Sequence, residues 1–279
     1  MKNIIIKTSI ILNLILLLNF AVFAQENSKA KIATEDEIKS DIAKVKCKNS
    51  ERLESVKELF KEKGAKDNEI IVEDDDGVKN LVVVKKGKTD ETIIIGAHYD
   101  ETGGGCGAID NWTGIVIVAN LYQTIKDFTT NKTYKFVAFD KEEQGLIGSR
   151  IMAKAIPKEE REKYCSMVNF DSFGLTYPQA TRNNSDKKLI ETAEELAKQM
   201  KMPFGKAGIQ NADSDSTSFR NVKIPAISFH GLNDKWQDYL HTHRDKVENV
   251  NITSVYFGYR FGLVFLAKLE AESCDAFRK

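Results

Sequence analysis

The feature that most constrains the fold is a short continuous apolar run, rich in β-branched residues, at positions 92–97. Such a run is typical of a strand that is buried on both faces at the centre of a sheet. Charged turns separate it from two similar runs that precede it, and three more runs follow it along the chain. These further predicted strands cover residues 69–72, 81–84, 134–139, 166–170 and 224–229.

Segments with apolar residues at helical spacing alternate with these strands. Residues 35–63 form one or two of the predicted helices, and the others cover 114–125, 145–156, 185–202 and 251–273. Alternating strands and helices predict an α/β fold, a three-layer sandwich with a mixed, mostly parallel central sheet. In sheets of this kind, ligands bind at the carboxyl ends of the strands.

The composition excludes several classes of protein. The chain has 279 residues, 42% of them hydrophobic and 29% charged, which excludes wholesale disorder and fibrous architectures. Its 41 basic and 41 acidic residues balance, whereas nucleic-acid-binding proteins normally carry a basic excess. We therefore expect no nucleic-acid partner and a single catalytic domain over residues 25–279.

Residues 1–24 have the pattern of a signal peptide. Lys2 and Lys7 form a positive start, an apolar run covers residues 8–20, and Val22 and Ala24 occupy the small-residue positions before the expected cleavage site. The run is too short to span a bilayer comfortably. The sequence thus predicts an exported protein, periplasmic or secreted, without a stable membrane anchor.

Four cysteines follow: Cys47, Cys106, Cys165 and Cys274. An even number in an oxidising compartment permits two disulfides, with three alternative pairings. A Cys47–Cys274 bridge would join the two ends of the mature chain, and buried free thiols are the other interpretation. None of the four lies in a C-x-x-C pair, so a cysteine zinc site has no support.

Chemically active side chains follow the predicted strands. His98 ends the run at 92–97, and Asp100 can accept its second ring N–H and fix its tautomer. Asp110 lies in a glycine-rich loop that leads into a helix, where its carboxylate can bridge two cations or cap the helix. The other interpretation of His98 is a capped histidine at a strand end.

Glu142 and Glu143 follow the strand at 134–139, and Asp171 follows the strand at 166–170. Two adjacent acids can divide two roles, one as a metal ligand and one as a proton carrier, although a solvated charge run is the alternative. His241 is a further candidate ligand, which Asp245 or Thr242 would orient.

Two other histidines have weaker claims to a role. His230 follows a predicted strand and is best interpreted as a packed or polar-loop histidine, while His243 is a bystander or an outer partner of His241. The glycine run at 103–105 has two interpretations, a backbone that passes close to the metals or substrate and a flexible surface loop.

The predicted topology brings the strongest candidates to one edge of the sheet. Two histidines and three carboxylates suit a pair of zinc ions bridged by one aspartate, and they leave manganese or cobalt open. The five predicted metal ligands are His98, Asp110, Glu143, Asp171 and His241.

Five ordered motifs resemble metallopeptidase family 28, the co-catalytic dizinc aminopeptidases. They are GAHYD at 96–100, AIDN at 108–111, EEQGLIGS at 142–149, NFD at 169–171 and HTHRD at 241–245. The resemblance covers roughly residues 80–270. A further element, SDSTSF at 214–219, differs from the family pattern, because Ser216 stands where the family usually has histidine.

The resemblance implies roles for the site residues. One zinc ion would be held by His98, Asp171 and the bridging Asp110, and the second by Glu143, His241 and Asp110. Glu142 would be the general base and acid, and Asp100 would orient His98. The implied substrates are peptides with a free N-terminus, from which N-terminal residues are hydrolysed.

Two alternatives remain. Glutaminyl cyclases resemble the same pattern but use one zinc ion, for which Asp110, Glu143 and His241 would be the ligands and Glu142 the proton shuttle. The Asp110-Asn111-x-x-Gly114 pattern and the EEQGLIGS run look more like peptidases. A non-catalytic peptide-binding homologue would be expected to have lost ligands or the base, and the sequence retains all of them.

Overall fold

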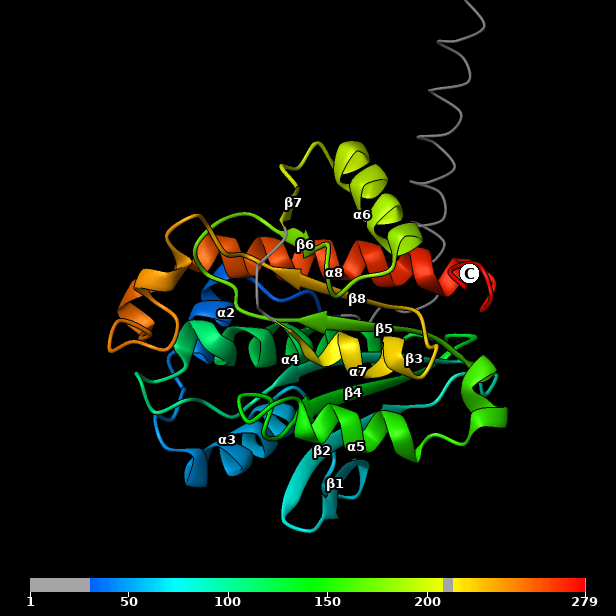
Figure 1. Cartoon of the computed structure of the whole chain (residues 1–279), viewed down its shortest axis with the longest axis horizontal. Helices are drawn as coiled ribbons and strands as arrows, with labels where there is room; N and C mark the ends of the chain where they lie inside the picture. Colours follow the sequence, from blue (N-terminus) through cyan, green and yellow to red (C-terminus); the bar gives the residue numbers. More distant parts are fainter. Residues whose placement is uncertain (1–30, 208–212, 279) are drawn as a thin grey trace, which may run out of the picture.

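The computed structural model describes residues 31–207 and 213–278; the predicted signal peptide lies outside them. Its centre is an eight-stranded sheet in the order β1-β2-β4-β3-β5-β8-β6-β7 (Figure 1). The strands are β1 (Ile70–Asp75), β2 (Val78–Lys85), β3 (Thr92–His98), β4 (Thr133–Phe139), β5 (Tyr164–Phe170), β6 (Gln179–Thr181), β7 (Gly205–Ala207) and β8 (Ala226–His230).

The middle of the sheet is parallel. Strand β3 pairs in parallel with β4 and β5, and β5 pairs in parallel with β8. Antiparallel pairs join β1 to β2, β2 to β4 and β6 to β8. All seven residues of β3 are buried, as expected for a parallel strand covered on both faces. The predicted α/β class with a mixed, mostly parallel sheet is confirmed.

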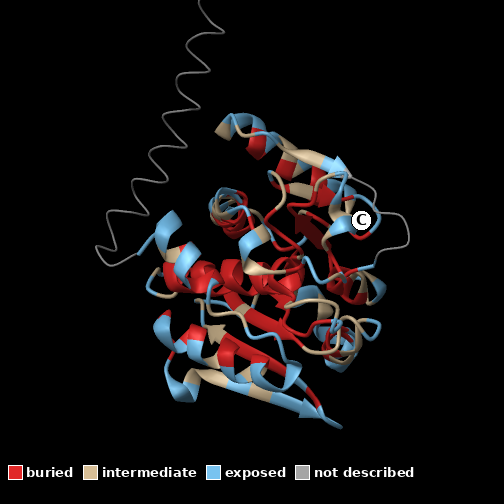
Figure 2. Ribbon diagram, turned by 90° about the vertical axis from the view of Figure 1, so that its left-hand side faces the viewer, coloured by how far each residue is buried: buried red, intermediate tan, exposed pale blue. Residues whose placement is uncertain are grey.

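Helices cover both faces of the sheet. On one face, the apolar core joins α2 (Glu35–Ile42), α3 (Asn49–Glu62), α4 (Thr113–Ile125), α6 (Lys187–Met200) and α8 (Ile252–Ala271). A smaller core on the other face includes residues of α5 (Ile147–Ala155) and α7 (Asp215–Asn221). Figure 2 shows the buried residues concentrated in the middle of the molecule and the exposed ones on its outer surface.

The predicted elements are present with ends shifted by a few residues, and the 35–63 segment is two helices. The prediction omitted β6, β7 and α7. Two of these are strands of three residues. The third, DSTSFRN, is rich in Ser, Asp and Asn, which favour caps and turns over helix interiors. Such short elements form because tertiary packing supports them.

The four cysteines form two disulfides, Cys47–Cys106 and Cys165–Cys274. The predicted Cys47–Cys274 bridge and the free-thiol interpretation are therefore both wrong. Helix α8 ends beside the start of β5, where the Cys274 sulfur lies 3.5 Å from the carbonyl oxygens of Glu162 and Lys163. Cys47 is bonded to Cys106, in the loop after the carboxyl end of β3, and therefore lies at the opposite ends of the strands from Cys274.

Among residues 31–207 and 213–278, none of the helices combines the length and the apolar character needed to cross a bilayer.

The Cys165–Cys274 bridge closes a loop with a sequence separation of 109 residues. The double substitution Cys165→Ser, Cys274→Ser should lower the free energy of unfolding by roughly 2–5 kcal/mol, because it increases the conformational entropy of the unfolded chain. Urea unfolding of both forms measures the difference. Non-reducing peptide mapping of the wild type checks the pairing, and a peptide that links Cys47 to Cys274 would refute it.

Candidate metal centre

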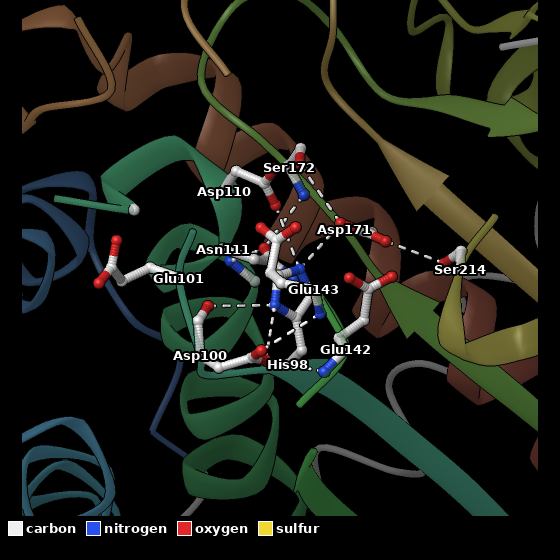
Figure 3. Close-up of polar contacts among 12 residues, drawn as sticks. His98, Asp100, Glu101, Asp110, Asn111, Glu142, Glu143, Asp171, Ser172 and Ser214 are labelled. Carbon is white, nitrogen blue, oxygen red and sulfur yellow. Dashed lines mark hydrogen bonds and ion pairs between the residues drawn. The ribbon is translucent and has the colours of Figure 1, made fainter. Parts of the chain in front are cut away.

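The five predicted ligands lie together at the carboxyl ends of β3, β4 and β5 (Figure 3 shows four of them). His98 is the last residue of β3 and is 1% exposed. Its Nε2 atom lies 3.1 Å from Asp110 Oδ1 and 3.5 Å from Asp171 Oδ1. One ring nitrogen of His98 thus faces two carboxylates that reach it from different segments of the chain.

Asp100 contacts the other ring nitrogen. His98 Nδ1 lies 3.3 Å from the Asp100 carbonyl oxygen and 3.4 Å from its Oδ1 atom. The same carboxylate accepts hydrogen bonds from the backbone N–H groups of Glu142, at 3.0 Å, and Glu143, at 3.2 Å. Asp100 therefore links the end of β3 to the turn that carries the two adjacent glutamates.

Asp110 does not cap helix α4. It lies in the turn Ala108–Trp112 with non-helical backbone angles, after which α4 starts at Thr113. Its two carboxylate oxygens diverge: Oδ1 faces His98, and Oδ2 lies 3.1 Å from His241 Nε2. The helix-cap interpretation is wrong because the N-cap of α4 is Trp112, and the Asp110 carboxylate contacts the two histidines instead of the first turn of the helix.

Two buried side chains hold this turn in place. The Asp245 carboxylate accepts hydrogen bonds from the backbone N–H groups of Ile109, at 2.6 Å, and Asp110, at 3.1 Å. Asn111 donates to the Phe170 carbonyl at 2.9 Å and accepts from the N–H of Ser172 at 3.0 Å. Asn111 thereby ties the Asp110 turn to the end of β5, a contact that the sequence analysis did not foresee.

Glu143 and His241 approach each other from separate loops. Glu143 Oε2 lies 3.2 Å from His241 Nε2, while Glu143 Oε1 is buried and has no hydrogen-bond partner among the described residues. Hydrogen bonds to Asp110 and Glu143 raise the pKa of His241 to about 10. The solvated-run interpretation of the two glutamates is thus wrong for Glu143, whose carboxylate points into the cluster.

The predicted orienting partners of His241 bind elsewhere. Asp245 is occupied by the Asp110 turn, and the Thr242 hydroxyl donates to the carbonyl of Tyr239 at 2.8 Å. The loop of His241 packs instead against the glycine run. A Cβ atom on Gly104 would lie 2.4 Å from the His241 carbonyl oxygen, so only glycine allows this approach. At Gly104 the run therefore lies close to the backbone of one proposed metal ligand.

Asp171 follows β5 and belongs to a network of hydroxyl groups. Its Oδ2 atom accepts a hydrogen bond from Ser214 Oγ at 2.9 Å, and Ser214 Oγ accepts from Asn169 Nδ2 at 2.6 Å. Ser216 and Ser228 extend the network, each through a hydroxyl contact of 2.8 Å. Ser216, at the position where the family resemblance expects histidine, is therefore a fully buried member of this network.

Glu142 lies close to His98 and Glu143: one potential metal-ligand atom of each of the three residues lies within 4.8 Å of the other two. Burial raises the pKa of Glu142 well above its usual range, and the neighbouring carboxylates of Asp171 and Asp215 act in the same direction. Burial also raises the pKa of Asp215 to about 7. The sequence assigned no role to Asp215, although the SDSTSF element contains it.

The donor atoms fit zinc in two sets that share Asp110. Each set holds one histidine nitrogen and two carboxylates: His98, Asp110 and Asp171 in one, and Asp110, Glu143 and His241 in the other. The contacts above span 3.1–3.5 Å. Ligands held at about 2.1 Å in a tetrahedron lie about 3.4 Å apart, so this spacing suits one ion in each set.

The remaining histidines lie outside both sets. His230 is 2% exposed, and its Nδ1 atom accepts the backbone N–H of Leu232, which confirms the interpretation as a packed histidine. Burial lowers the pKa of His230 to about 4. His243 is exposed to solvent.

A family model described as peptidase family M28 matches residues 80–256, so the chain belongs to this family. Among curated relatives, aminopeptidase YwaD of Bacillus subtilis is 24% identical over 186 residues. The match covers 62% of this chain but 40% of YwaD, so the chain spans well under half the length of this relative.

Solved structures show the same fold. The LapA aminopeptidase of Legionella pneumophila superposes with a TM-score of 0.70 at 19% identity, over 87% of this chain and 77% of LapA. A glutaminyl cyclase from an Acidobacteriales bacterium gives a TM-score of 0.72 at 16% identity, over 88% of this chain and 97% of the cyclase. The fold alone therefore does not separate the peptidase from the cyclase.

Ser214→Ala should lower the affinity for zinc by roughly tenfold, because Asp171 loses the hydroxyl that orients its carboxylate. Competition with a chromogenic chelator measures the affinity. Ser216→Ala is a matched control, since Ser216 is buried in the same network but does not contact Asp171 in it. Equal zinc affinities in the two variants would refute the role of Ser214.

His230 should make the metal-free chain sensitive to acid. The unfolded chain takes up a proton on His230 near pH 6.5, whereas the folded chain does so only near pH 4, so stability falls as the pH drops between these values. The wild type should lose up to about 3 kcal/mol more than His230→Gln over this range. Urea unfolding at successive pH values tests this, and parallel curves would contradict it.

Proposed function

We propose that the chain is an exported, zinc-dependent aminopeptidase that hydrolyses N-terminal residues from peptides. The observation that carries the proposal is Asp110, whose two oxygens each lie 3.1 Å from the Nε2 atom of a different histidine. A carboxylate in this position can be shared by two metal ions. The two donor sets around it account for all five proposed ligands.

The proposed export also has support. Two disulfides join the four cysteines, and disulfides persist mainly in oxidising compartments outside the cytosol. In this proposal residues 1–24 are a signal peptide, and residues 25–279 form a single catalytic domain.

When bound, zinc would polarise the scissile carbonyl and lower the pKa of a water molecule to about 7. The chain itself would supply proton transfer. Glu142 lies beside both donor sets, and the high pKa that burial gives its carboxylate suits a group that accepts a proton and then donates it to the leaving amine. Asp100 would keep His98 Nε2 free for the metal through its contact with Nδ1.

The site would favour substrates with a free N-terminus. Two zinc ions would offset the charges of the carboxylate ligands, but Glu142 and Asp215 lie beside the donor sets and bind no metal in this proposal. A free α-amino group would bind a zinc ion or one of these two carboxylates, whereas an acetylated N-terminus would not. This contact would confine hydrolysis to the first peptide bond.

The second candidate is a glutaminyl-peptide cyclotransferase with a single zinc ion. The structural match with this chain covers 97% of the cyclase. A complete ligand set for one ion is formed by Asp110, Glu143 and His241 alone. A single ion would leave His98 and Asp171 without a metal, although they approach Asp110 as closely as a second ion requires. This second set favours the peptidase.

Mass spectrometry of defined peptides tests the proposal. Peptides that begin with Leu, Phe, Ala or Gln should lose residues stepwise from the N-terminus, a chelator should stop the reaction, and an N-acetylated control should stay intact.

Glu142→Gln should keep the zinc content and lower turnover by roughly 10²–10⁴, the usual contribution of a general base.

Each alternative gives a different result. Loss of ammonia alone from the Gln peptide would establish the cyclase. Intact peptides together with tight zinc binding would support a non-catalytic peptide-binding protein. Full activity of Glu142→Gln would remove Glu142 from the mechanism.

A further inference from the structure

A segment that precedes the family-matched region, residues 46–52, packs against the loop at 99–107. It connects α2 to α3 and includes the first turn of α3. The loop that it contacts leads from the end of β3 to the turn that carries Asp110. The segment therefore adjoins the backbone on which the proposed metal centre is built.

Arg52 makes the central contacts and is completely buried. Its Nε atom donates to the Tyr99 carbonyl, and Nη1 donates to the carbonyls of Lys46, at 3.0 Å, and Cys106, at 2.8 Å. Nη2 donates to the Gly107 carbonyl at 3.1 Å. One planar guanidinium group thus fixes both ends of the loop.

Two further contacts tie the segment to the same loop. Asn49 donates to the Glu101 carbonyl at 2.8 Å and accepts from the Glu101 N–H at 2.9 Å. The Cys47–Cys106 disulfide joins the two segments covalently.

The loop in turn contacts the two parts of the metal centre that carry Asp110 and His241. The Gly107 carbonyl accepts the N–H of Trp112 at 3.0 Å, on the far side of Asp110. Gly104 lies against the backbone of His241, as described above. A shift of the loop would therefore move the bridging aspartate and one histidine relative to the rest of the site.

We propose that Arg52 is a positioning residue for the metal centre: it holds the loop at 99–107 so that Asp110 and His241 meet at the spacing that zinc requires. This inference rests on the proposed function. It adds that the chain before residue 80 contributes to metal binding through backbone contacts, without supplying a ligand.

Charge and positioning have opposite effects on zinc affinity. Arg52 is close enough to Glu101, Asp100, Asp245 and Asp110 to interact with them electrostatically, yet its hydrogen bonds go to backbone carbonyls. If only its charge mattered, Arg52→Met would remove a cation near the site and strengthen zinc binding. If positioning dominates, the same variant weakens zinc binding, so the sign of the change separates the two roles.

The test compares zinc affinities of the full chain by chelator competition. Arg52→Met should lower the affinity by about tenfold or more, as loss of a ligand-orienting partner does. Arg52→Lys keeps the charge but lacks the planar fork of donors, so it should also weaken binding. Asn49→Ala, at an exposed position, should cause a smaller fall.

Lys132→Met is the matched control. Lys132 is 3% exposed, and its ammonium group donates to the carbonyls of Glu270, at 3.0 Å, and Glu272, at 2.7 Å. It lies immediately before β4, at the amino end of the strand, whereas the metal centre lies at the carboxyl ends of the strands. Both Met variants should lower the melting temperature in chelator, but the control should keep the zinc affinity of the wild type.

An affinity of Arg52→Met equal to or above that of the wild type would overturn the inference, as would an equal fall in Lys132→Met. If Arg52→Met does not fold, Arg52→Lys and Asn49→Ala decide by the same criterion. A wild type that fails to bind zinc would overturn the proposed function, together with the inference that rests on it. Because affinity is measured without a peptide, this failure is distinguishable from a failure of Arg52 alone.

Discussion

The divergence of the two Asp110 oxygens toward two histidines is the interaction on which the rest of the site depends. It requires non-helical backbone angles at Asp110 and Asn111, immediately before α4, and the Asp245 carboxylate and the Asn111 amide stabilise this conformation. A local backbone conformation therefore determines whether two donor sets share one ligand.

Without bound cations, the cluster of acids around Asp110 destabilises the folded chain. Burial raises the pKa of Asp215 and Asp245 to about 7, and it raises the pKa of Glu142 well above its usual range. Carboxylates with these properties are held together by the fold against their mutual repulsion, which lowers the stability of the metal-free chain. Metal binding would offset this cost, so stability and metal content are expected to rise together.

The sequence predicted the parts of the molecule that depend on local patterns. Apolar runs located the long strands, and the residues that follow them, such as His98 and Asp171, were correctly expected to meet at one edge because parallel strands end together. The contacts of Asp245, Ser214 and Arg52 were not predictable, because they join segments far apart in the chain and have no periodicity. The prediction of the disulfide pairing was wrong for the same reason, because the pairing depends on the end of the strands at which each cysteine lies.

The position of β3 between β4 and β5 has a consequence for the dimensions of the site. Three consecutive strands carry His98, the turn to Glu143, and Asp171, and neighbouring strands in a sheet are about 4.8 Å apart. The backbone hydrogen bonds between these strands therefore set the spacing of the strand ends that carry these donors, whichever side chains are present. Any other chemistry placed at the ends of these three strands would have to use donor groups at about this interval.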